Sequence, residues 1–131
     1  MLVENDNSVC VWLGNLTPHE FAEYIDREEI SRATPLNPFA VDMHDYFYDR
    51  ELLTGNLVPD PISIEALLHP LAFSPSYCHA VHAAAEQMGI QSANCVVALL
   101  RHELRIEQWP ATSPLDFVGN FELAHCEEKR S

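Results

Sequence analysis

The sequence predicts an α+β fold: a largely antiparallel sheet of about four or five strands with three helices packed on it. Three observations support this prediction. Short apolar segments are interspersed with amphipathic segments, but without a regular strand–helix–strand alternation. The chain has 131 residues, 47% of them hydrophobic, which is enough for one domain with a core. No apolar run approaches the roughly 20 residues of a membrane span. We therefore expect a single domain over residues 1–131, with its core at about 8–123 and a frayed tail at 124–131.

The first strand is predicted over residues 8–13, where apolar and β-branched residues end at Gly14-Asn15. A helix then begins at Thr17, a suitable N-cap residue. Pro18 suits the first helical position, and Glu20 is placed to complete a capping box. The predicted inward stripe of this helix consists of Phe21, Tyr24 and Ile25.

Prolines dominate the next segment. Pro35 and Pro38 predict a loop over residues 30–41, with at most one helical turn around Pro38–Met43. The pattern of Phe47–Val58 is ambiguous, but Glu51–Thr54 is expected to open a strand before a Gly55-Asn56 turn. Pro59-Asp60-Pro61 is read as a break between elements.

Two further helices follow. Ser63 is predicted to cap a short helix over Ile64–His69, which Pro70 stops. Ser74-Pro75 is predicted to cap a longer one, and Gly89 stands where a left-handed residue after its C-terminus is expected. The predicted inward stripe of the longer helix consists of Tyr77, Val81, Ala84 and Met88.

The remaining strands surround Trp109-Pro110. Asn94–Leu100 is a continuous apolar run, which predicts a central strand covered on both faces. Polar residues interleave over 101–107, as expected where one face becomes solvated. The last strand is predicted over residues 115–121.

The charge is strongly acidic and unevenly spread. Twenty Asp and Glu residues oppose seven Lys and Arg, for a net charge of −13. Twelve of the acidic residues lie in the first sixty positions, where only three arginines oppose them. A domain of this charge repels nucleic acid and anionic membranes, so we expect to find neither as a partner. The charge serves either solubility or the binding of a basic partner.

The expected compartment is the cytoplasm. The first residues lack the basic and apolar regions of a signal peptide. Cys10, Cys78, Cys95 and Cys126 are widely spaced and contain no C-x-x-C pair, so we expect reduced thiols, mostly buried.

Catalytic motifs are not evident. The sequence contains neither a glycine-rich phosphate loop nor G-x-S-x-G. His79, His82 and Glu86 are spaced to share one helix face with a metal, but that face is expected to be solvated. The adjacent pairs His102-Glu103 and His125-Cys126 are poorly placed for catalysis. We therefore expect no metal, no cofactor and no enzymatic activity.

Three blocks in order carry a resemblance to a known family. The first is Val11-Trp12-Leu13-Gly14-Asn15, followed by a helix containing Phe21-Ala22-Glu23-Tyr24. The second spans residues 37–49, and the third is Leu115-Asp116-Phe117-Val118-Gly119-Asn120-Phe121. Over residues 8–123 the chain resembles the immunity protein 22 family of bacterial polymorphic-toxin systems. The resemblance implies an α+β protein that binds and neutralises a secreted toxin, often a nuclease, without catalytic residues of its own.

The expected site is therefore a protein-binding surface on a monomer or weak dimer. Asp42, Asp45 and Asp49 are the leading candidates, with Tyr46 and Tyr48 as aromatic contacts. Acidic residues expected mainly to steer a basic toxin are Glu20, Glu23, Glu28 and Glu29, and Glu51 completes the candidate surface. Two alternatives stay open: a small metal- or ligand-binding enzyme using His79, His82 and Glu86, and an adaptor or chaperone for a basic cargo protein.

Overall fold

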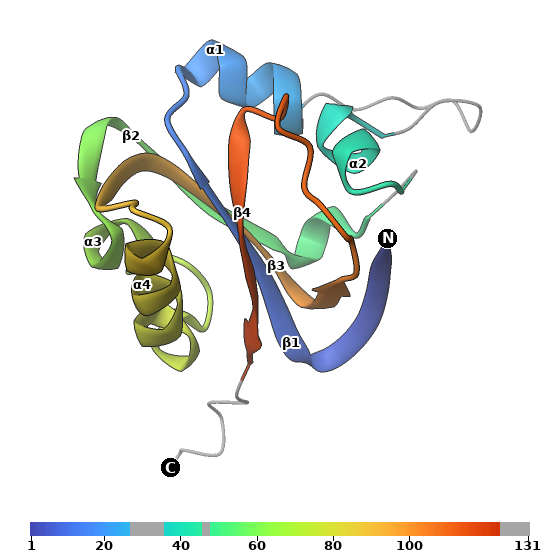
Figure 1. Ribbon diagram of the computed structural model, residues 1–131. Coiled ribbons are helices and arrows are strands. Elements are labelled where there is room, and N and C mark those ends of the chain that lie inside the picture. Colours follow the sequence, from blue (N-terminus) through green and yellow to red (C-terminus); the bar gives the residue numbers. More distant parts are fainter. Residues whose placement is uncertain (27–35, 46–47, 124–131) are drawn as a thin grey trace.

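The computed structural model describes residues 1–26, 36–45 and 48–123. Within them, four strands form one antiparallel sheet in the order β2-β3-β1-β4 (Figure 1). The strands are β1 (Leu2–Gly14), β2 (Leu53–Ser63), β3 (Ser92–Leu104) and β4 (Leu115–Glu122). The predicted α+β class and the antiparallel sheet are confirmed. The predicted tail at 124–131 lies outside the described residues.

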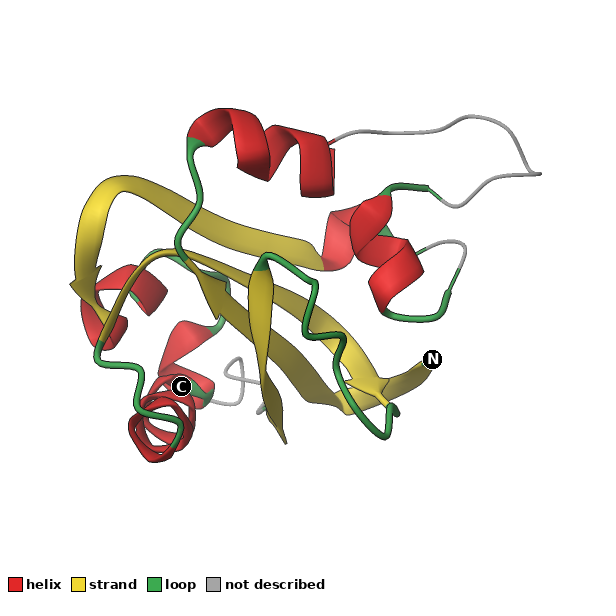
Figure 2. Ribbon diagram, turned by 45° about the horizontal axis from the view of Figure 1, so that its top comes forward, coloured by secondary structure: helices red, strands yellow, loops and turns green. Residues whose placement is uncertain are grey.

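Helices cover both faces of this sheet (Figures 1 and 2). On one face lie α3 (Ile64–Leu68) and α4 (Cys78–Gln87), and the 3₁₀ turn Ser74–Ser76 lies between them in the chain. On the other lie α1 (Pro18–Phe21), which continues as the π-helical turn Ala22–Asp26, and α2 (Pro38–Asp42). The 3₁₀ turn Arg50–Leu52 leads into β2. All these elements are short, so their stability depends on packing against the sheet.

Side chains of β1 alternate between two hydrophobic cores. Val9, Val11 and Leu13 pack with the residues of α3 and α4. Cys10 and Trp12 point to the opposite core, together with α2 and the π-helical turn. β3 alternates in the same way, which confirms the prediction of a central strand buried on both faces.

β1 is longer than predicted, beginning at Leu2 instead of residue 8. Leu2–Glu4 pair with His102–Leu104 on β3. An irregular stretch between Glu4 and Val9 separates this pairing from the rest of β1. Arg101 adopts a positive φ of 65° at that point, which turns the end of β3. The polar composition of residues 4–7 conceals this pairing, because the side chains there are largely solvated.

The prediction of a turn at Gly55-Asn56 is wrong. Both residues lie inside β2, paired with Val97 and Val96 of β3. Pro59-Asp60-Pro61 also lies inside the strand, where register with β3 is lost between Leu57 and Ile62. β2 forms an edge of the sheet, and an edge strand tolerates prolines because their missing N–H groups would face solvent.

The predicted caps of α1 and α3 are confirmed, but α4 differs from its prediction. It begins at Cys78 after Tyr77, and Ser74–Ser76 form a separate 3₁₀ turn instead of its cap. Its buried face is also displaced. Thr17 and Glu20 form the predicted capping box, and Ser63 caps α3. Gly89 has the expected positive φ, 81°. The buried residues of α4 are Val81 and Ala85, with Tyr77 just before the helix, and the predicted inward residue Met88 is 46% exposed.

Asparagine side chains join segments that the sheet ladder leaves apart. Asn94 Oδ1 accepts from Leu16 N at 2.8 Å, and its Nδ2 donates to Leu16 O at 2.6 Å. Asn120 makes the same pair of bonds with the backbone of Leu104, at 2.9 and 3.0 Å. These side-chain amides satisfy the backbone N–H and C=O groups of Leu16, just after β1, and of Leu104, at the end of β3.

Trp12 is the centre of an aromatic group on the α1/α2 face. Its ring is fully buried and contacts Phe39, Trp109 and Phe117 at centroid distances of 4.7, 5.7 and 5.3 Å. Its Nε1 finds no hydrogen-bond partner in the described part of the chain. Trp109 Nε1, by contrast, donates to Leu115 O at 2.8 Å. Packing therefore outweighs the cost of one unpaired donor at Trp12.

We predict that Trp12→Ala lowers the free energy of unfolding by about 3–5 kcal/mol, because it leaves a cavity between the sheet and α2. The measurement is chemical denaturation followed by circular dichroism. Met88→Ala, on the exposed end of α4, serves as the control and is expected to change stability by less than about 0.5 kcal/mol. Equal stability of Trp12→Ala and the parent protein would contradict this structural role.

Candidate functional site

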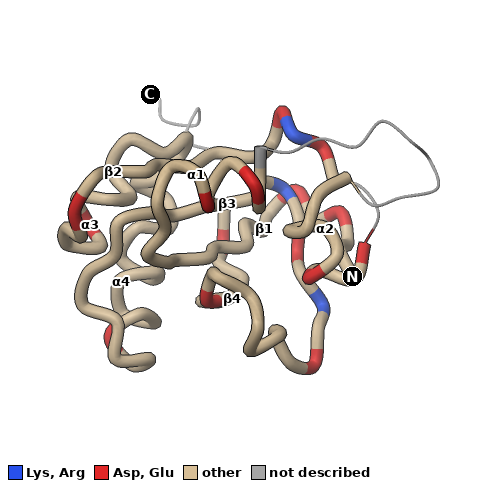
Figure 3. Tube along the Cα trace, turned by 90° about the horizontal axis from the view of Figure 1, so that it is seen from above, with Lys and Arg blue, Asp and Glu red and all other residues tan. Residues whose placement is uncertain are grey.

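The predicted acidic residues lie in the helical layer that covers one face of the sheet, together with the turn leading into β2. This acidic layer comprises α1 with its π-helical turn, α2 with residues 43–45, and residues 48–52. Figure 3 shows acidic positions on α1 and beside α2. Its candidate carboxylates are those of Glu20, Glu23, Asp42, Asp45, Asp49 and Glu51.

The parts of this layer contact one another through the hydrophobic core. Tyr24 contacts Phe39 with ring centroids 5.5 Å apart, and Phe39 contacts Tyr48 at 5.6 Å. Asn37, the N-cap of α2, donates through Nδ2 to Ile25 O and to Tyr48 Oη, at 2.8 and 2.7 Å. The segments that carry the acidic residues are thereby held on one side of the sheet.

Asp42 is a partly buried carboxylate with a structural partner. Its Oδ2 accepts from Tyr24 Oη at 2.5 Å, and the same hydroxyl lies 2.8 Å from Ser113 Oγ. Burial of the Tyr24 ring, together with the Asp42 carboxylate, raises the pKa of Tyr24 above its ordinary value. The phenol therefore remains protonated and donates to Asp42, which fixes the position of that negative charge.

Asp45 and Asp49 also bind the backbone. Asp45 Oδ2 accepts from Leu2 N at 2.8 Å, so it connects the segment after α2 to the start of β1. Asp49 Oδ1 accepts from Glu51 N at 3.0 Å and caps the 3₁₀ turn Arg50–Leu52. Asp45 is partly exposed and Asp49 is exposed. Each retains carboxylate surface for a partner while holding local structure.

The remaining predicted contacts differ in accessibility. Glu20, Glu23 and Glu51 are exposed, as their predicted roles require. Tyr48 is only 2% exposed and packs on Phe39, so the prediction that it offers an aromatic contact is wrong. The prediction rested on the charged residues that alternate with aromatic residues in this segment, a pattern that is typical of an exposed surface. Tyr46, Glu28 and Glu29 lie outside the described residues.

The predicted group of His79, His82 and Glu86 on α4 differs in the structure. His79 is exposed, whereas His82 lies 3.8 Å from Glu86 Oε2 and 3.8 Å from Glu65 Oε2 of α3. His82 therefore bridges two helices. Within the described ranges, no group of three His, Cys, Asp or Glu side chains is arranged to hold a metal ion.

Other reactive groups are engaged or shielded. Burial raises the pKa of the Cys10 thiol to about 12 and that of Cys95 to about 11. His102 Nδ1 lies 2.9 Å from Leu100 O. Glu103 bonds to Arg105 and Asn5, and Arg105 is the main cause of its lowered pKa. His125 and Cys126 lie outside the described residues.

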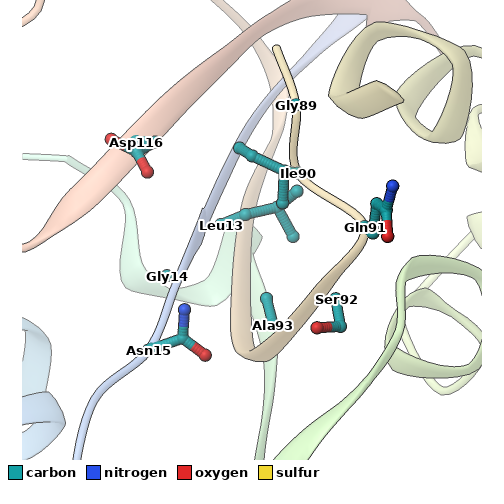
Figure 4. Close-up of a pocket in the computed structure, with 9 residues that line it drawn as sticks. All are labelled: Leu13, Gly14, Asn15, Gly89, Ile90, Gln91, Ser92, Ala93 and Asp116. Atoms are coloured by element: carbon teal, nitrogen blue, oxygen red, sulfur yellow. The ribbon is translucent and has the colours of Figure 1, made fainter. Parts of the chain in front are cut away.

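A pocket of about 370 Å³ opens where β1 ends against the α4–β3 loop (Figure 4). Leu13 and Ile90 lie at its centre, and Asp116 stands across from them on β4. Asp116 is the one ionisable residue among the described residues that line it. A single carboxylate without a second titratable group does not form an acid–base pair.

Comparisons of the chain with protein-family models, with curated protein sequences and with solved structures find no match. Among the described residues, every helix is too short or too polar to cross a membrane.

The link between Tyr24 and Asp42 generates a stability prediction. In a double-mutant cycle of Tyr24→Phe and Asp42→Ala, we expect a coupling of about 1–2 kcal/mol in the free energy of unfolding, because this hydrogen bond involves a charged, partly buried acceptor. Glu86→Ala on α4, across the sheet, provides the control cycle with Tyr24→Phe. Its effects should add within about 0.5 kcal/mol. Additive effects in the Tyr24/Asp42 cycle would contradict the link.

Proposed function

We propose that this protein is an immunity protein that binds a cognate secreted toxin, a basic nuclease, and neutralises it by covering its active region. The observation that carries the proposal is the acidic layer: six candidate carboxylates belong to segments that cover one face of the sheet. A nuclease attracts phosphate with a basic cleft, and a carboxylate-bearing surface is complementary to that cleft. The proposed place of action is the cytoplasm.

The charge of this layer is weakly opposed in the described structure. Arg50 is the only arginine or lysine in its described segments, and Arg50 Nη1 donates to Ile25 O at 2.8 Å. Arg101 and Arg105 lie on or just beyond β3, with Asp6 and Glu103 as their neighbours. Among the described residues of α1, α2 and the turn into β2, a basic partner would therefore meet six candidate carboxylates and one arginine.

The hydrogen bonds of Asp42 and Asp45 support a role as anchors. A side chain already held by a protein partner loses little further freedom when a toxin binds, which lowers the cost of association. Glu23 and Glu51, which are exposed, suit the steering of a basic protein during approach. Asp49 combines both properties, since it is exposed and also caps a turn.

We predict that the triple variant Asp42→Asn/Asp45→Asn/Asp49→Asn protects cells poorly against the toxin encoded by the adjacent gene. Asparagine keeps the side-chain oxygen that accepts from Tyr24, Leu2 and Glu51, so the fold should survive the loss of charge. Dissociation from the purified toxin should be about tenfold or more faster because Asp42 and Asp45 are anchors, and association at low salt should slow because the exposed Asp49 also steers. The difference in association rate should shrink at high salt, where surface charges are screened.

The matched control is Glu4→Gln/Glu107→Gln/Glu122→Gln, which removes the same charge from exposed positions outside the acidic layer. It should retain protection and nearly the original association rate. Full protection by the first variant, with unchanged association and dissociation rates, would remove the central aspartates from the mechanism. A DNA-cleavage assay with the complex separates inhibitor from adaptor, because an adaptor would bind its cargo without blocking nuclease activity.

A further inference from the structure

A second pocket, of about 290 Å³, lies beside the start of α1. Its walls come from the residues that follow β1, the first residues of α1, the stretch of β2 that leaves register with β3, and Asn94 of β3. Glu20 is the one charged residue among the described residues that line it. This volume is at the lower limit of ligand sites, which suits a single side chain better than a larger molecule.

The other walls of this pocket are mainly apolar and stiff. They include Leu16, Pro18, Val58, Pro59 and Pro61. Proline has a fixed φ and no backbone N–H, so these three positions present carbon instead of hydrogen-bond donors. Such walls suit the flat face or the aliphatic stem of a long side chain.

The polar groups of the pocket are already oriented. Glu20 Oε1 accepts from Thr17 N at 2.9 Å, while Glu20 N donates to Thr17 Oγ1 at 3.1 Å. The capping box holds the carboxylate at the pocket and uses donors of α1 that would otherwise oppose a cation. Asn94 also lines the pocket, but both ends of its amide bind the backbone of Leu16. The carboxylate of Glu20 is therefore the dominant recognition group.

We propose that this pocket receives an arginine side chain of the basic partner protein, an inference that rests on the proposed function. A guanidinium group is planar, weakly hydrated and forked. It can pack against proline and valine carbons while donating to the Glu20 carboxylate. A lysine ammonium is more strongly hydrated and suits apolar walls less. Glu20 is then an anchor of the complex, in contrast to the steering role predicted from the sequence.

The test titrates the isotope-labelled full chain with N-acetyl-arginine methylamide and follows backbone amide shifts by NMR. We expect saturable shifts at Thr17, Glu20, Val58 and Asn94. The citrulline and lysine analogues, one neutral and one ammonium-bearing, should bind about threefold or more weakly. Absence of localised shifts with the arginine probe, or equal affinity for the citrulline or lysine analogue, would overturn the proposal.

Glu20→Gln is the matching variant, since glutamine keeps the acceptor for Thr17 N and removes only the charge. Its affinity for the arginine probe should fall about threefold or more. Glu107→Gln, which carries the same charge change outside the pocket and outside the acidic layer, should keep the original affinity. Equal loss in both variants would also overturn the proposal. The probe titration of the unmodified chain decides the matter even if a variant folds poorly. The titration contains no toxin, so a negative result would contradict the arginine pocket and leave the immunity proposal intact. Arginine binding by a chain that fails to neutralise the toxin would contradict the immunity proposal and leave the pocket intact.

Discussion

The burial of β1 and β3 on both faces is the constraint on which the rest of the structure depends. A strand that alternates Val9, Val11 and Leu13 with Cys10 and Trp12 presents apolar side chains to both sides of the sheet. Water must be excluded from both, so helices are needed above and below. One side receives α3 and α4. The other receives only short helical turns, which enclose their core through aromatic contacts around Trp12 and Phe39.

Short turns and the start of β1 leave some backbone N–H groups without partners in a helix or in the sheet, and side chains of the acidic layer accept from three of them. Glu20 accepts from Thr17 N, Asp49 from Glu51 N and Asp45 from Leu2 N. Carboxylates accept such bonds strongly because they are charged. One set of residues therefore completes the turns and also supplies the negative surface. For these three carboxylates, the hydrogen bonds offset part of the cost of placing charges of one sign close together.

The sequence predicted the elements whose signals are local and missed those that depend on tertiary partners. Thr17, Pro18 and Glu20 specified a capping box, and the apolar run through Val96 specified a buried strand. The pairing of Gly55 within β2 depends on β3, and neither a Gly-Asn pair nor two prolines reveals an edge strand. Six of the predicted acidic residues lie on segments that cover one face of the sheet, and their role in binding stays a prediction. The burial of Tyr48 was missed because its partners belong to another element. Phe39 lies in α2, and Asn37, the N-cap of α2, is 11 residues away in the sequence.

The pocket beside Glu20 illustrates how such a miss affects function. Pro59-Asp60-Pro61 looks like a simple break in the sequence, yet in an edge strand its prolines become walls facing the start of α1. Because the capping box holds Glu20 in place, a carboxylate and apolar surface occur together in this pocket. Diffuse charge accelerates encounter with any basic protein, whereas a shaped recess with one fixed carboxylate discriminates among them. The inhibitor proposed above would need both features to reject the many other basic proteins of a cell.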